Sequence, residues 1–308
     1  MIVVLTGGTG GAKLIEGLSH EVDPAELTII CNTADDFVLH GLNISPDLDT
    51  IMYTLAGLSD PVRGWGIQED TFTVLQQLER LGAEVWFNLG DKDIATHITR
   101  THLLRVGLKL SDVTQRFCIH LGIRAQILPM SDDGIETRVD TVEGEISFQE
   151  YFVKRRWQPE VKKIFYAGVK QSCPGPGVLE AIRGGAAIII CPSNPVTSIG
   201  PILAVPGIRN ALKQVTAPVI GVSPIIGKSA ISGPAHKLMM AQCMEPSALG
   251  AAKGYADFLD QFVIDGKDEK LRGQFEALGI EVLATSIFME SLADKQLLAR
   301  QVLALIEK

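Results

Sequence analysis

The chain begins with Met1-Ile-Val-Val-Leu-Thr-Gly-Gly-Thr-Gly-Gly-Ala-Lys-Leu14, an apolar run that passes directly into glycines. This pattern predicts a buried strand over 2–6, a loop over 7–11 and a helix over 12–18. A strand, a glycine loop and a helix in this order are typical of an open parallel α/β sheet, which binds ligands at the carboxyl ends of its strands. Glycines let the backbone approach an anion, and a helix N-terminus offers unpaired N–H groups. The loop therefore predicts a phosphate or nucleotide contact.

This glycine loop departs from both common nucleotide-binding motifs. The dinucleotide fingerprint that starts at Gly8 needs a further glycine at position 13, where this chain has Lys13, and the segment lacks the Gly-Lys-Ser/Thr of a P-loop. A tight turn that needs glycine for positive φ angles is the purely structural alternative. An NAD(P)-dependent Rossmann oxidoreductase is another alternative, and the missing glycine argues against it.

Composition excludes several classes of protein. With 308 residues, of which 46% are hydrophobic and 21% charged, the chain can build a core without disulfides or metals. Its formal net charge of −8 argues against binding to nucleic acid, because a phosphate backbone requires clustered Lys and Arg. The five cysteines are widely spaced and form no C-x-x-C pair, which favours a reducing cytoplasmic location. The apolar runs are too short to span a membrane, so no membrane association is expected.

The rest of the chain continues the α/β alternation, with one interruption. Residues 131–168 alternate polar and apolar positions between polar turns, which predicts a small inserted antiparallel or helical subdomain. We therefore predict a Rossmann-like, doubly wound, largely parallel sheet in a single domain over 1–308. Strands are predicted over 27–31, 186–191, 219–222, 262–265 and 282–286, and helices over 70–81, 91–106, 111–121 (capped by Ser111), 207–213, 234–242, 249–259, 269–278 and 295–307. The last of these helices has an apolar face, which predicts a homodimer.

Acidic side chains gather in two segments that we interpret as loops. Asp35 and Asp36 follow the second strand, and Asp47 and Asp49 lie in Ser45-Pro-Asp-Leu-Asp-Thr50. Mg²⁺ prefers carboxylate oxygens, so a pair from separate loops is suited to hold it against a diphosphate. The alternative is that these residues form Asx turns and helix caps without any ligand.

Three further segments carry polar groups at predicted strand ends. Lys92 lies in Leu89-Gly-Asp-Lys-Asp93, where it either meets a polar ligand group or remains a solvated lysine. Residues 192–201 and 223–227 are rich in hydroxyl and amide groups, which suits hydrogen bonding to a base, a ribose or phosphates. His97 and His102 are five residues apart and do not form the pair of a zinc helix, so a buried structural role is expected for His97.

Taken together, these segments resemble the 2-phospho-L-lactate transferase family. The resemblance extends from residue 1 to about residue 240 and involves many blocks in the same order. The blocks are residues 1–14, Asn32-Thr-Ala-Asp-Asp36, Ser45-Pro-Asp-Leu-Asp-Thr50, Gly64-Trp-Gly66, Leu89-Gly-Asp-Lys-Asp93, Ala95-Thr-His97, Leu128-Pro-Met-Ser-Asp132, Pro192-Ser-Asn-Pro-Val-Thr-Ser-Ile-Gly-Pro201 and Ser223-Pro-Ile-Ile-Gly227.

This resemblance implies a step in the biosynthesis of the deazaflavin coenzyme F(420). Family members transfer a phospho-acid unit from a guanosine diphosphate ester to the deazaflavin precursor Fo (7,8-didemethyl-8-hydroxy-5-deazariboflavin), releasing GMP with Mg²⁺ as cofactor. The acid on the donor, whether 2-phospho-L-lactate or a related phosphoenolpyruvate or phosphoglycerate unit, is left open. A related family of non-catalytic nucleotide-sugar-binding regulators shares the glycine loop, but the segments Ser45–Thr50 and Gly64-Trp-Gly66 favour the transferase.

The resemblance also implies roles for individual residues. Asp49, Lys92 and Asp91 are expected on the deazaflavin side, and Asp49 and Asp36 are the catalytic candidates, with Asp49 as general base if one is used. The metal candidates are Asp36, Asp47 and Asp49. The guanosine diphosphate is expected to contact Gly8, Thr9, Gly10, Ser193, Asn194, Thr197, Ser198, Ile226 and Gly227. Replacing Asp49 by asparagine is expected to abolish transfer and to leave folding intact.

Overall fold

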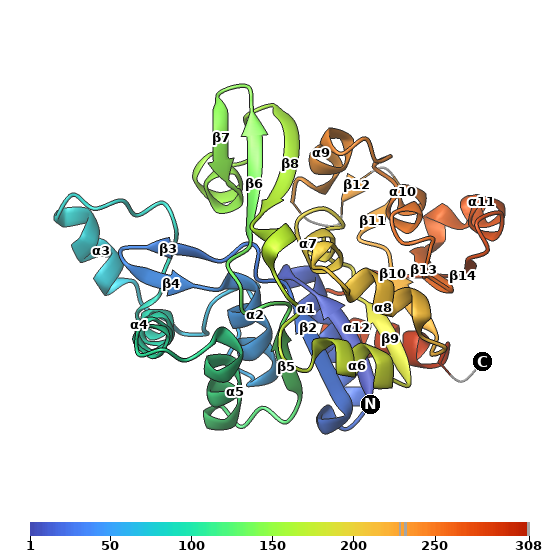
Figure 1. Cartoon of the computed structure of the whole chain (residues 1–308), viewed down its shortest axis with the longest axis horizontal. Coiled ribbons are helices and arrows are strands. Elements are labelled where there is room, and N and C mark those ends of the chain that lie inside the picture. The colour runs from blue at the N-terminus through green and yellow to red at the C-terminus, as the bar shows by residue number, and fades with distance from the viewer. Residues whose placement is uncertain (228, 231–232, 307–308) are drawn as a thin grey trace.

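A central sheet of seven parallel strands organises the structure, a computed structural model that describes residues 1–227, 229–230 and 233–306 (Figure 1). The strand order is β14-β13-β10-β9-β1-β2-β5, and every neighbouring pair is parallel. The strands are β1 (Ile2–Thr6), β2 (Leu27–Cys31), β5 (Gln126–Pro129), β9 (Ala187–Ile190), β10 (Val219–Val222), β13 (Gln261–Asp265) and β14 (Glu281–Thr285). The predicted Rossmann-like parallel sheet is confirmed.

Helices cover both faces of this sheet, so the strands at its centre, β1, β2, β9 and β10, are buried along almost their whole length. Successive residues of β1 point to opposite faces, so Val3 and Leu5 join one apolar cluster and Val4 joins the other. The first cluster includes residues of α6 (Val178–Gly184), α7 (Ile199–Ala204), α8 (Ile208–Gln214), α9 (Ala235–Ala241), α10 (Ala248–Lys253) and α11 (Arg272–Glu276). The second includes residues of α1 (Gly8–Glu21), α2 (Pro46–Leu55), α5 (Leu110–His120) and α12 (Leu292–Leu303).

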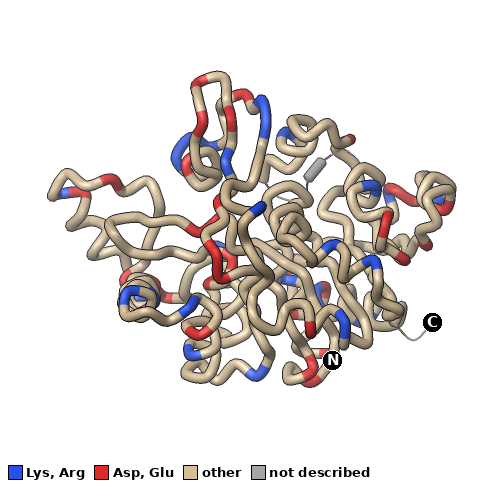
Figure 2. Tube along the Cα trace, in the orientation of Figure 1, with Lys and Arg blue, Asp and Glu red and all other residues tan. Residues whose placement is uncertain are grey.

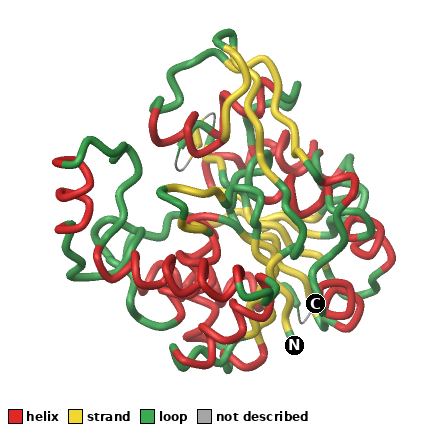
Figure 3. The backbone as a smooth tube through the Cα atoms, turned by 60° about the vertical axis from the view of Figure 1, so that its left-hand side comes forward, coloured by secondary structure: helices red, strands yellow, loops and turns green. Residues whose placement is uncertain are grey.

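Smaller units extend from the carboxyl side of the sheet. The segment predicted as an insertion forms an antiparallel sheet of β6 (Glu136–Thr141), β7 (Gly144–Ser147) and β8 (Val161–Ala167), which rises away from the central strands (Figure 3). A hairpin of β3 (Phe37–Leu39) and β4 (Leu42–Ile44) lies beside α3 (Thr73–Arg80) and α4 (Asp91–Arg105). A third pair, β11 (Ile225–Ile226) and β12 (Ser229–Ala230), and short helices at η1 (Pro24–Glu26), η2 (Glu150–Lys154), η3 (Val169–Gln171) and η4 (Gly266–Leu271) complete the described chain. Among all the described residues, no helix is long and apolar enough to cross a membrane.

The predicted loop over 7–11 is wrong, because α1 already begins at Gly8. Its glycines are needed for close packing inside the first helical turns. A Cβ at Gly10 would lie 2.6 Å from the carbonyl oxygen of Pro192, and one at Gly11 would collide with the side chain of Thr6. Glycine here lets the helix approach the strand and the neighbouring loop.

Several other boundaries also differ from the prediction. The acidic segment at 45–50 is the start of α2, with Pro46 in the first turn, and not a loop. Ser111 does not cap α5, because the helix begins at Leu110, and the Ser111 hydroxyl donates to Asp132 instead at 2.7 Å. The helix predicted over 70–81 is shorter and corresponds to α3, which has no buried residue. The helix predicted over 249–259 ends at Lys253. The helix predicted over 269–278 is divided into η4 and α11. The helix predicted over 295–307 corresponds to α12, which ends at Leu303. Its predicted end at residue 307 lies outside the described residues. Because α12 packs on α1, its apolar face is partly covered within the chain.

Candidate active site

The two halves of the sheet diverge at β1 and β9. The chain proceeds outward from β1 through β2 to β5 on one side, and from β9 through β10 to β14 on the other. Such a topological switch point opens a crevice at the carboxyl ends of the two central strands, which is where open α/β sheets bind ligands. Here the crevice is a cleft of about 540 Å³. It lies between the loop after β9 and residues 7–11, which join β1 to the first turn of α1 and are called the glycine turn below.

Most of the residues predicted for the nucleotide come together in this cleft. Seven of them line it, namely Gly8, Thr9, Gly10, Ser193, Asn194, Thr197 and Ser198. Ile226 and Gly227 are not in the lining, which at that point is formed by Pro224. The backbone N–H of Gly227 instead donates to the carboxylate of Asp268 at 2.8 Å.

A pair of hydrogen bonds fastens the two loops of the cleft to each other. The Ser193 hydroxyl donates to the carbonyl of Gly7 at 2.7 Å, and the N–H of Gly7 donates back to the Ser193 oxygen at 3.3 Å. Any Cβ at Gly7 would lie 2.6 Å from a carboxylate oxygen of Asp47 and 2.7 Å from the Ser198 Cβ. Helix α1 has no acidic residue in its own first turn, and the carboxylate that faces its positive end is that of Asp47, which accepts a hydrogen bond from the Gly8 backbone.

Two buried carboxylates, Asp35 and Asp47, also line the cleft. The Asn32 amide donates to Asp47 at 2.9 Å, yet burial raises the pKa of Asp47 to about 6. Burial and the neighbouring charge of Asp47 raise the pKa of Asp35 well above its ordinary value. One carboxylate oxygen of Asp35 has no hydrogen-bond partner among the described residues. Among the described residues no Lys, Arg or His pairs with either of these two acids. Acidic residues are concentrated where the β3–β4 hairpin, α2 and the central sheet meet (Figure 2).

Asp36 points elsewhere and lines a second cavity of about 930 Å³. Its carboxylate accepts a hydrogen bond from the Ser45 hydroxyl at 2.6 Å, and burial raises its pKa well above the ordinary value. The two cavities are neighbours, because residues adjacent in the sequence line different ones. Asp35 lines the cleft, whereas Asp36 lines the second cavity. Likewise Phe87 lines the cleft, whereas Trp86 lines the second cavity.

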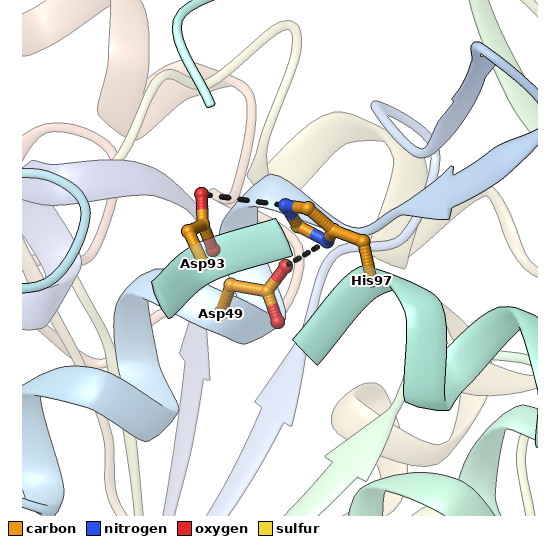
Figure 4. A group of neighbouring side chains, drawn as sticks. All are labelled: Asp49, Asp93 and His97. Atoms are coloured by element: carbon orange, nitrogen blue, oxygen red, sulfur yellow. Dashed lines mark ion pairs between the residues drawn. The ribbon is translucent and has the colours of Figure 1, made fainter. Parts of the chain in front are cut away.

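Asp49 belongs to a buried network beneath the cleft and lines neither cavity. It forms an ion pair with Arg100 of α4, whose side chain is only 1% exposed. His97 is buried, as expected, with Nδ1 3.7 Å from Asp49 and Nε2 3.3 Å from Asp93 (Figure 4). Ligand atoms of these three residues lie within 4.8 Å of one another, a spacing that would suit a metal ion. The Arg100 guanidinium already neutralises Asp49, however, so this cluster needs no further cation.

The structure does not bring Asp91 and Lys92 into the cleft lining. Lys92 is exposed at the start of α4, and its ammonium donates to the Gln68 carbonyl at 3.0 Å. The Asp91 carboxylate accepts hydrogen bonds from Thr71, Thr73 and Val74, which hold its pKa below the usual range. Asp91 therefore anchors the start of α3.

The cleft contains functional candidates that sequence reasoning missed. Lys13 is the one basic side chain among the described residues that line it, and its position two residues after Gly11 was the available signal. An aromatic group also lines it, comprising Trp65, Phe87, Phe148 and Phe152. These rings come from three separate segments, so only the folded chain brings them together.

Comparisons with known proteins agree with this architecture. A family model described as 2-phospho-L-lactate transferase CofD matches residues 2–287. A 2-phospho-L-lactate transferase of Methanosarcina mazei is 43% identical over 290 residues, covering 94% of this chain and 95% of the relative. A phosphoenolpyruvate transferase of Streptomyces griseus is 44% identical over 313 residues, covering 100% of this chain and 98% of the relative. A solved protein of Bacillus halodurans has the same fold, with a TM-score of 0.64 at 19% identity over 100% of this chain and 99% of that one. The chain therefore belongs to the 2-phospho-L-lactate transferase CofD family.

Proposed function

We propose that this chain is a 2-phospho-L-lactate or phosphoenolpyruvate transferase of coenzyme F(420) biosynthesis, which transfers the phospho-acid unit of a guanosine diphosphate ester to the deazaflavin Fo and releases GMP. The observation that carries the proposal is full-length identity of 43% and 44% to relatives that bear these two names. The cleft at the switch point supports it, because the glycines at the start of α1, the helix N-terminus and Lys13 suit a diphosphate.

In the proposed reaction a hydroxyl oxygen of the acceptor's ribityl chain attacks the phosphorus that carries the acid. A new P–O bond forms, the bond to the bridging oxygen of GMP breaks, and the electron pair leaves with GMP. Phosphoryl transfer of this kind has a loose transition state, so it depends mainly on positioning and charge neutralisation. The hydroxyl proton passes to solvent. Asp49 is a poor general base here, because it is paired with Arg100 and does not line the cleft.

The phosphates are proposed to lie against the backbone of Gly8 to Gly10, where glycine allows close approach, with the ammonium of Lys13 beside them. Ser193 and Asn194 act by shaping the loop. Ser193 is bonded to Gly7, and the Asn194 side chain accepts the N–H of Val196 at 2.9 Å. Thr197 and Ser198 complete the nucleotide side of the cleft.

Asp35 and Asp47 fit a Mg²⁺ ion better than the other two acids of the predicted set, Asp36 and Asp49. Both line the cleft and both have raised pKa values. Among the described residues neither is paired with Lys, Arg or His, and a buried oxygen of Asp35 lacks a hydrogen bond. Carboxylate oxygens are the donors that Mg²⁺ prefers, and the bound ion neutralises diphosphate charge. Asp36 faces the second cavity and Asp49 already has its cation, so we propose Asp35 and Asp47 as the metal-holding residues.

The test is a direct assay of transfer. The purified protein is incubated with Mg²⁺, Fo and, in turn, the lactyl, enolpyruvyl and glyceryl diphosphoguanosine donors, and products are identified by mass spectrometry. We expect the phospho-acid adduct of Fo and one equivalent of GMP from at least one donor. Absence of adduct with every donor, together with failure to bind Fo, would refute the proposal and favour a nucleotide-binding regulator.

A further inference from the structure

The Gly64-Trp65-Gly66 turn presents a large aromatic side chain to the cleft. Gly64 and Gly66 have φ angles of +72° and +71°, the left-handed region that favours glycine. The N–H of Gly64 donates to the carbonyl of Asp60 at 2.9 Å, and the N–H of Asp60 donates to the carbonyl of Gly66 at 3.1 Å. The turn is therefore closed by its own backbone, which gives the Trp65 side chain a defined direction.

Trp65 is half-buried and lies outside the packed core. Among the described residues it belongs to none of the three apolar clusters, although Trp86 and Phe87 pack against one of them. Its ring is backed by the guanidinium of Arg63, which lies 5.7 Å from the Trp65 ring centroid and 5.0 Å from that of Phe72. A half-buried tryptophan that is held from behind and lines a cleft is positioned to contact a ligand.

The chemistry of the cleft lining matches an acceptor that joins a planar ring to a polar chain. Polar and charged groups come from the glycine turn, Lys13 and Asp47, whereas apolar surface comes from Trp65, Phe87 and Phe148. On the basis of the proposed function, we propose that Trp65 is the surface on which the planar ring of the deazaflavin acceptor stacks. Aromatic rings stack on tryptophan irrespective of their substituents, so orientation comes from the polar groups nearby.

The second cavity is the competing location for the ring, because it too holds aromatic residues, Phe37 and Trp86. It is larger, but it contains no part of the glycine turn and is lined by different residues. Its lining includes the acids Glu84, Glu136 and Glu150. An acceptor bound there would be separated from the donor phosphates, whereas one stacked on Trp65 shares their cleft.

The three tryptophans of this chain allow a sharp test, because Trp65 lines the cleft, Trp86 lines the second cavity and Trp157 lines neither. Each is replaced singly by phenylalanine, and tryptophan emission is followed while Fo is added to the full-length protein with Mg²⁺. We expect Trp65→Phe to lose most of the quenching by Fo. The matched controls Trp86→Phe and Trp157→Phe should retain it.

Affinity provides the second readout. Trp65→Ala should raise the Kd for Fo by about 5- to 150-fold, the range that stacking of one ring on an aromatic side chain supplies. The Kd for GDP, measured by calorimetry on the same variant, should stay within about twofold, which also shows that the variant is folded. The proposal is overturned if Trp86→Phe removes the quenching while Trp65→Phe keeps it, or if Trp65→Ala weakens GDP instead of Fo. Each of those results leaves the transferase intact, whereas no binding of Fo to the unchanged protein overturns the proposed function as well.

Discussion

Replacing Arg100 by methionine should destabilise the protein by about 3–5 kcal/mol, the usual effect of removing one partner of a buried ion pair. Methionine keeps the apolar stem but leaves the Asp49 carboxylate buried without its cation, since both side chains are almost inaccessible to solvent. Asp49 would then also lie uncompensated in the network that contains Asp93. Unfolding entropy of about 2 cal/mol/K per residue converts this loss, for 308 residues, into a decrease in Tm of about 5–8 °C.

Thermal unfolding followed by calorimetry is the assay, with Arg105→Met as the control. Arg105 lies on the same helix but is exposed, and its guanidinium donates to the Gly41 carbonyl at 3.2 Å, so its replacement should change Tm by less than about 1 °C. Combining Arg100→Met with Asp49→Leu should recover much of the loss, because both charges are then gone. A Tm for Arg100→Met within about 1 °C of the unchanged protein, or a double variant less stable than the single one, would refute the reasoning.

The same pair changes the interpretation of Asp49→Asn. The sequence suggested that this variant would lose transfer and keep its stability. With Arg100 buried against Asp49, the asparagine variant leaves a guanidinium without its counter-charge, so a lower Tm should accompany any loss of activity. Loss of activity in this variant alone is therefore not evidence for a catalytic carboxylate.

Two further predictions concern the cleft. Because the pKa of Asp47 is raised to about 6, the folded state holds this proton more tightly than the unfolded state, so the stability it contributes is complete below about pH 4 and is lost as the pH rises through 6. Mg²⁺ should therefore raise Tm near neutral pH and have little effect below pH 5, and an equal effect in Asp47→Asn would contradict the assignment. Lys13→Met should raise the Kd for GDP by about 10- to 150-fold, as for loss of a hydrogen bond to a charged group, while the exposed Lys270→Met stays unchanged in the same titration. Equal Kd values for these two lysine variants would remove Lys13 from the phosphate site.

The central strands were predictable because their signal is local. Ile2–Thr6, Leu27–Cys31 and Val219–Val222 coincide with the predicted ranges, since each is a continuous apolar run bounded by polar or turn residues. Helix α2 was missed although Pro46 followed by acidic residues is a common helix start, because the acids were interpreted as a loop that holds metal.

The parts of the site that follow from the order of strands in the sheet could be predicted. The parts that depend on contacts between side chains far apart in the sequence could not. The glycine turn and the segment after β9 were expected at one sheet edge, and the structure places them in one cleft. The position of Asp49 could not be anticipated, because its partner Arg100 lies 51 residues away and nothing in either local sequence links them. The contact of Trp65 with the same cleft likewise depends on how the segment between α2 and α3 folds back.

The bond between Gly7 and Ser193 joins residues 186 positions apart, and it has a consequence for how the chain acquires its fold. During synthesis β1 emerges first and finds β2 quickly, but its other neighbour, β9, is made only after more than half of the chain. Pairing across so large a separation forms late, because loop closure opposes it until the intervening elements are in place. The centre of the finished sheet is thus an open strand edge in the nascent chain, and this edge can pair with other chains until β9 covers it.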